Sequence, residues 1–71
     1  MQHTIDLIRR IYPDALPPGE PHLVTACILA ALEQRFPWLA TAPEPTRREV
    51  GLDVLDAVKA LQAYEASLWR N

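Results

Sequence analysis

Three side chains in this sequence are of the types that bind soft metals: His3, His22 and Cys27. A structural zinc site normally takes four such ligands, arranged in pairs with short spacings. His22 and Cys27 are five residues apart within one expected helix, which points them in different directions, and His3 stands alone near the start of the chain. We therefore expect no metal site and no cofactor.

The sequence offers few groups for nucleophilic or acid–base catalysis. Cys27 lies in the apolar run ACILAAL, where we expect a buried thiol, and no neighbouring base or cation would favour its thiolate. Ser67 falls on the expected surface of a helix. Glu49, Asp53 and Asp56 form an acidic row that is typical of a solvated helix face, whereas a catalytic pair of carboxylates needs a cleft. We predict that the protein is not an enzyme. A minimal enzyme or carrier-like protein, with Cys27 as its centre, is the weakest alternative.

Two arginine pairs are the candidate contacts to nucleic acid: Arg9 with Arg10, and Arg47 with Arg48. In a dimer that sets them along one side, they would contact phosphates as in small helical repressors and antitoxins. The formal net charge of −2 provides no long-range attraction to phosphate. The connectors between the expected helices are also too long and proline-rich for a helix-turn-helix motif. A small helical DNA-binding regulator or antitoxin is therefore the second hypothesis for function.

The segment 51–61, GLDVLDAVKAL, is similar to the prosthetic-group site of acyl carrier proteins. The resemblance implies a carrier in which a serine holds a phosphopantetheine arm. At the serine's position this chain has Val54, which has no hydroxyl group, so the attachment chemistry is excluded. We interpret the segment as part of an amphipathic helix. The matching positions hold Gly51, Asp53, Leu55, Asp56 and Val58.

The length and composition are those of one small domain, 1–71, whose core is marginal. A chain of this size buries only about 60% of the surface that its unfolded form exposes. A single cysteine excludes an internal disulfide and fits a reducing cytoplasm. Residues 1–10 lack the features of a signal peptide, and the longest apolar run, 26–32, is too short to span a bilayer. Because six of the seven Lys and Arg residues are Arg, we expect a GC-rich bacterial gene.

Prolines divide the chain into three helical segments with proline-rich connectors, which predicts an all-α fold. The first helix should cover 4–12, with Thr4 as its N-cap, and is too short to persist without docking on the rest. The second should cover 21–36. Since it is apolar almost all round, we expect it to be the central helix, buried on nearly every side.

The third and longest helix should cover 46–69, starting from a capping box of Thr46 and Glu49. Apolar residues at spacings of three and four along this helix predict a seam that covers the central helix. A second strip runs beside the seam and includes Leu52, Leu55 and Trp69. In the connector 37–45, we expect Trp38 and Leu39 to fold back onto the core.

The central helix has more apolar surface than two other helices can cover, so we expect some of it to remain exposed. The first hypothesis is therefore a protein–protein interaction module: an accessory, adaptor or inhibitor-type subunit. Such a module would bury its apolar strip in a homodimer or on a larger partner. A compact monomer covered by the tryptophans and the proline-rich loops is the alternative. The expected interface residues are Leu52, Leu55, Trp69 and Trp38, with Arg47 and Arg48 at the polar rim.

Overall fold

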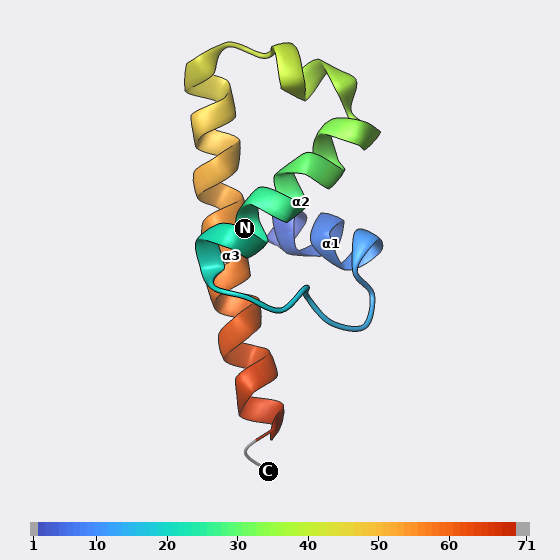
Figure 1. Cartoon of the computed structure of the whole chain (residues 1–71), viewed down its shortest axis with the longest axis vertical. Coiled ribbons are helices and arrows are strands. Elements are labelled where there is room, and N and C mark those ends of the chain that lie inside the picture. Colours follow the sequence, from blue (N-terminus) through green and yellow to red (C-terminus); the bar gives the residue numbers. More distant parts are fainter. Residues whose placement is uncertain (1, 70–71) are drawn as a thin grey trace.

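The computed structural model describes residues 2–69, with side chains for 2–68. This part of the chain contains three α-helices and one 3-10 helix, joined by connectors. The all-α architecture with a short, a middle and a long helix is confirmed. The long helix runs the height of the molecule in Figure 1, and the other two α-helices pack against it. In chain order the elements are α1 (Gln2–Ile11), α2 (Pro21–Arg35), η1 (Pro37–Thr41) and α3 (Glu44–Trp69).

Helix α1 docks on α3 through one side of its surface. Its Ile8 side chain is completely buried. The helix begins at Gln2, whose side-chain amide donates a 3.0 Å hydrogen bond to Asp6. Thr4 therefore lies inside α1, and the prediction that it caps the helix is wrong.

Helix α3 begins at Glu44, two residues before the expected start. Thr46 therefore lies within the first turn, and the predicted capping box is not formed at the helix start. Pro45 is tolerated in that turn because the first amide groups of a helix have no partner within it. The first turn is closed by the backbone N–H of Arg47, which donates to the carbonyl oxygen of Pro43 over 3.0 Å.

The connector between α1 and α2 is tied down by side chains of α3. One oxygen of Glu65, Oε2, accepts hydrogen bonds from the Arg9 guanidinium at 3.1 Å and from the Leu16 backbone N–H at 3.2 Å. Gln62 donates to the carbonyl oxygen of Gly19 over 3.0 Å. Gly19 has φ +136°, a backbone conformation that residues with a Cβ atom rarely adopt, so the turn before α2 requires glycine here.

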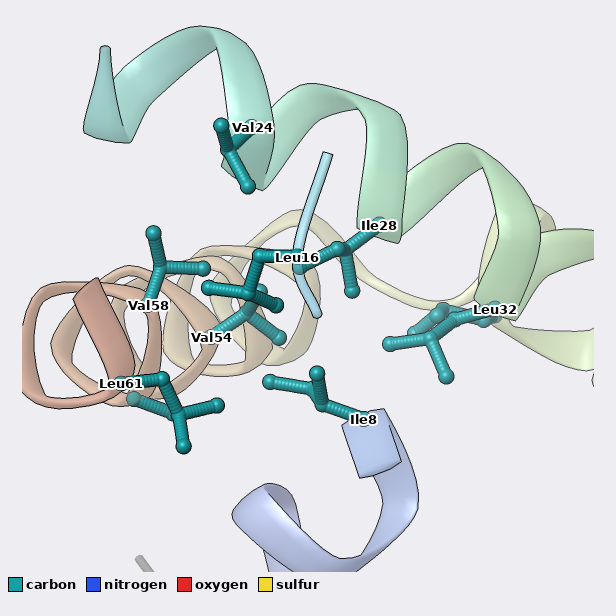
Figure 2. Packing of buried hydrophobic residues seen from close by; sticks show 10 residues of the cluster. Ile8, Leu16, Val24, Ile28, Leu32, Val54, Val58 and Leu61 are labelled. Carbon is teal, nitrogen blue, oxygen red and sulfur yellow. The ribbon is translucent and has the colours of Figure 1, made fainter. Parts of the chain in front are cut away.

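The core lies where α1, α2 and the connector meet the middle of α3, and Figure 2 shows these side chains pointing toward one another. Val54 and Val58 of α3 occupy its centre and are almost completely buried. The buried apolar residues are Ile8, Leu16, Val24, Ile28, Leu32, Leu39, Val54, Ala57, Val58 and Leu61.

Helix α2 is buried on one face only, so the prediction of a helix enclosed on nearly every side is wrong within one copy of the chain. The buried face includes Thr25, whose hydroxyl donates a 2.7 Å hydrogen bond to the carbonyl oxygen of Pro21. The reason for the one-sided burial is that both other α-helices lie on the same side of α2. The opposite face exposes Leu23, Ala26, Cys27 and Ala30.

The exposure of Cys27 corrects a further expectation about α2. An apolar neighbourhood in the sequence suggested a buried thiol, but the thiol lies on the uncovered face of α2. The run around it places Ile28 and Leu32 in the core but leaves Ala26, Cys27 and Ala30 exposed.

The molecule is elongated and exposes more surface than a compact monomer of its size. Its extents are 43 × 21 × 19 Å and its radius of gyration is 12.3 Å, whereas a compact chain of this length has a radius of gyration of roughly 11 Å. The accessible surface is 5131 Å² for 8.0 kDa, against roughly 4,450 Å² from the scaling of folded monomers. The chain thus exposes about 15% more surface than that scaling gives.

Part of this extra surface belongs to the last turns of α3. The expected seam is buried as far as Leu61, but beyond it Tyr64 and Leu68 are 57% and 55% exposed. Only the part of the seam up to Leu61 is therefore covered by other helices, because α1 and α2 reach no further along α3.

Candidate functional site

An apolar groove of about 260 Å³ opens where the C-terminal end of α2 diverges from α3. Figure 1 shows α2 rising away from α3 toward η1, which connects the two at the top of the view. The exposed side chains of Phe36 and Trp38 form part of the wall. The groove is lined by Thr4, Leu7, Leu32, Phe36, Trp38, Leu39, Val50, Asp53 and Val54.

The local sequence explains how η1 shapes this groove. Pro37 cannot continue α2, and the chain turns into a short 3-10 helix held by a 2.9 Å hydrogen bond from the Leu39 N–H to the Phe36 carbonyl oxygen. In a 3-10 helix successive residues point about 120° apart, so neighbours cannot both face the core. Leu39 is buried and Trp38 is 60% exposed. The prediction is therefore confirmed for Leu39 and wrong for Trp38.

The polar groups of the groove are few and lie on its α1 and α3 sides. Thr4 and Asp53 are the polar residues in its lining. Glu49 and Asp56 lie one turn before and after Asp53 along α3 and are exposed with it. The ion pairs among the described side chains involve none of these three carboxylates. The groove is thus an apolar surface with an acidic edge.

A second groove adjoins the first between α2 and α3. It is about 480 Å³ in volume, and it shares Leu39 and Val50 with the first groove. Arg48 of its lining makes a 3.1 Å ion pair with Glu44, but both side chains are mostly in water, where such a pair contributes little. The remaining lining residues are Leu29, Glu33 and Arg47.

The expected interface residues do not gather in one place. Trp38 lines the apolar groove, and Arg47 and Arg48 line the second groove. Leu52 is exposed and Leu55 is half-buried on α3, and neither belongs to the lining of these two grooves. The side chain of Trp69 lies outside the described residues.

Thr4, Leu7 and Phe36 line the groove although the sequence did not predict them as site residues. The segment Phe36-Pro37-Trp38, two aromatic residues around a helix-ending proline, was the available signal. It gave no indication of α1, which supplies the opposite wall.

The four arginines considered for nucleic-acid binding have different surroundings. Arg9 pairs with Glu65 at 3.1 Å and is mostly buried, and Arg48 pairs with Glu44. Arg10 and Arg47 are exposed. Half of the candidate phosphate contacts are therefore engaged with carboxylates of the chain itself.

Neither a prosthetic-group site nor a metal site is found among the described residues. Val54, which stands where acyl carrier proteins have the modified serine, is buried in the core and has no access to a prosthetic arm. Within residues 2–69, no three His, Cys, Asp or Glu side chains come together as metal ligands would. In the same range no helix is both long and apolar enough to cross a membrane.

Comparison with models of protein families, with curated proteins and with solved structures found no match to this chain.

Proposed function

We propose that this protein is a protein–protein interaction module, an accessory, adaptor or inhibitor-type subunit that buries its apolar groove against a second copy of itself or a larger partner. The observation that carries the proposal is the groove with its exposed aromatic wall, formed by Phe36 and Trp38. Aromatic side chains beside an apolar hollow are typical of the centre of a binding interface.

The exposed surface supports the same proposal. The chain exposes roughly 680 Å² more than the scaling of folded monomers gives, close to the ~800 Å² that each partner buries in an ordinary interface. The charged residues near the two grooves, Asp53 on one side and Arg47 and Arg48 on the other, would form the polar rim.

We further propose that the protein acts in the cytoplasm of a bacterium. Its single cysteine, exposed on α2, suits a reducing compartment, and its cations are almost all arginine.

The first experiment measures self-association and binding of helical peptides. Sedimentation of the purified chain over a wide range of concentration detects the former, and selection from a displayed library of helical peptides detects the latter. Burying a tryptophan that is 60% exposed contributes about 3 kcal/mol. Trp38→Asp should therefore weaken either kind of binding by at least about tenfold.

Leu23→Asp is the matched control, since Leu23 is 63% exposed and lies on α2 outside the lining of both grooves. It should leave binding within about twofold of the unmodified chain. A chain that stays monomeric and selects no peptide would overturn the proposal. So would equal effects of the two substitutions.

The DNA-binding hypothesis loses one of its four candidate contacts, because the Arg9 side chain is mostly buried and pairs with Glu65. It remains separable from the first proposal. Binding to duplex DNA that falls steeply with salt and is lost in an Arg47→Ala, Arg48→Ala double variant would favour it.

A further inference from the structure

The last described turns of α3 expose apolar side chains beyond the part of the helix that α1 and α2 cover. Tyr64 and Leu68 are four residues apart, so they lie on one face of the helix, and more than half of each is exposed. These two side chains extend outward from α3, so they are complementary in shape to a groove.

The groove and these turns face the same side of α3. Asp53 at the groove edge and Tyr64 are eleven residues apart, which is close to three helical turns. Ala60 lies between them on the same side, and it is exposed. A small side chain at that point allows a second helix to approach closely.

We propose that the groove of one copy takes Tyr64 and Leu68 of a second copy, in a two-fold dimer whose α3 helices run antiparallel. The inference rests on the proposed function and commits its partner to the chain itself. In one antiparallel register Tyr64 lies opposite Asp53 of the other copy, and Leu68 lies opposite Glu49, beside Val50. Two-fold symmetry then forms the same contact twice.

The chemistry of the two surfaces is complementary. Leu68 meets the apolar lining around Val50 and Trp38. Tyr64 has an apolar ring and a polar tip, and its hydroxyl would donate a hydrogen bond to the Asp53 carboxylate, the charged group of the groove. The surface that the chain exposes beyond the scaling of folded monomers, roughly 680 Å², is close to the ~800 Å² that each copy buries in an ordinary interface.

A cross-linking experiment tests this arrangement in a Cys27→Ser background. Glu49→Cys and Ser67→Cys place thiols on exposed positions beside the groove and beside Leu68. They are eighteen residues apart on one helix, about 27 Å, and a disulfide needs Cα atoms within about 7 Å. Any 49–67 disulfide must therefore join two copies, and the proposed register brings these positions together.

The matched control is the pair Arg48→Cys and Ala66→Cys, which are also exposed and eighteen residues apart, but on another side of α3. Under mild oxidation at equal concentration, the 49–67 pair should form covalent dimers at least about tenfold faster than the control. Equal rates for the two pairs would overturn the proposed dimer.

A mixing experiment gives an independent result. Trp38→Asp damages the groove, and Leu68→Asp damages the surface that enters it; both positions are exposed, so the fold should persist. Each variant alone should dimerise at least about tenfold more weakly than the unmodified chain. A mixture should form heterodimers more readily than either variant forms homodimers, because one of the two contacts is then intact.

Different results would contradict the proposed dimer and the proposed function. A strictly monomeric chain, or a dimer without the 49–67 preference or the rescue on mixing, overturns the second copy as the occupant. In each of these cases the selection of helical peptides, with its dependence on Trp38, still decides whether the groove is a binding site.

Discussion

Replacing Glu65 by alanine should show how much of the stability depends on the anchoring of the connector between α1 and α2. The substitution removes the acceptor of two hydrogen bonds, one from Arg9 at 3.1 Å and one from the backbone N–H of Leu16 at 3.2 Å. It also leaves the Arg9 guanidinium, which is mostly buried, without its carboxylate.

The size of the effect follows from burial. The side chains of Arg9 and Glu65 are 26% and 23% exposed, and a hydrogen bond to a charged group in such surroundings contributes about 1.5–3 kcal/mol. Because both donors share one carboxylate oxygen that still touches water, we expect a total loss of about 2 kcal/mol. A domain of this length has a stability of roughly 4–10 kcal/mol, so the variant should remain folded at 25 °C with a clearly lower stability.

The second ion pair of the structure provides the control. Arg48 and Glu44 are also 3.1 Å apart, but their side chains are 71% and 79% exposed. Arg48→Ala should therefore change the stability by less than about 0.5 kcal/mol. Two ion pairs of the same length then differ several-fold in their effect on stability, because the Glu65 pair is less exposed and Glu65 also accepts the Leu16 N–H.

The assay is urea unfolding followed by circular dichroism at 222 nm, at one fixed protein concentration because self-association would add to the apparent stability. Combining Arg9→Ala with Glu65→Ala in a double-mutant cycle isolates the pair itself, with an expected coupling of about 1 kcal/mol. A loss below about 0.5 kcal/mol for Glu65→Ala, or equal losses for Glu65→Ala and Arg48→Ala, would refute the reasoning.

Four further predictions concern single positions. Cys27 should react with a maleimide in the folded state nearly as fast as in urea, because its thiol is exposed; strong protection in the folded state would contradict the position of α2. Gly51→Ala should raise the midpoint of urea unfolding by an amount equivalent to about 0.5–1 kcal/mol, since a Cβ there would meet Leu29 at an ordinary 3.9 Å. In the same assay Gly19→Ala should lower stability by about 1 kcal/mol or more, because φ is +136°; effects of the same sign for both glycines would be inconsistent with this backbone. Ile28→Ala, at a completely buried position, should cost about 2–5 kcal/mol in chemical unfolding, and a loss under 1 kcal/mol would mean that α2 does not pack as described.

The helical architecture was predictable because proline acts locally. Pro13 and Pro37 closely follow the ends of α1 and α2, and Pro21 starts α2, as the sequence indicated. The N-caps predicted at Thr4 and Thr46 were wrong because both helices begin two residues earlier. Threonine is only a preferred capping residue, and a helix can begin without one. At the start of α3 the helix extends through Pro45, which can stand in a first turn, so Thr46 was not needed as a cap.

The candidate site was only partly predictable, because it depends on where the helices lie relative to one another. The sequence indicated an excess of apolar surface and predicted that Leu39 is buried, but it could not show that Trp38 beside it stays exposed. The groove brings Thr4 to Asp53, residues with no local relation in the sequence. The pairing of Arg9 with Glu65 has the same origin: the partners are 56 residues apart, and no pattern of spacing reports them.

Leu39 and Val50 form a wall that belongs to both grooves. An occupant on one side of such a wall rests on the same side chains that an occupant on the other side would touch. Any shift of these side chains that improves one fit alters the other, and thermodynamic linkage makes that influence equal in both directions. Binding in one groove would thus be coupled to binding in the other through Leu39 and Val50, without movement of a whole helix.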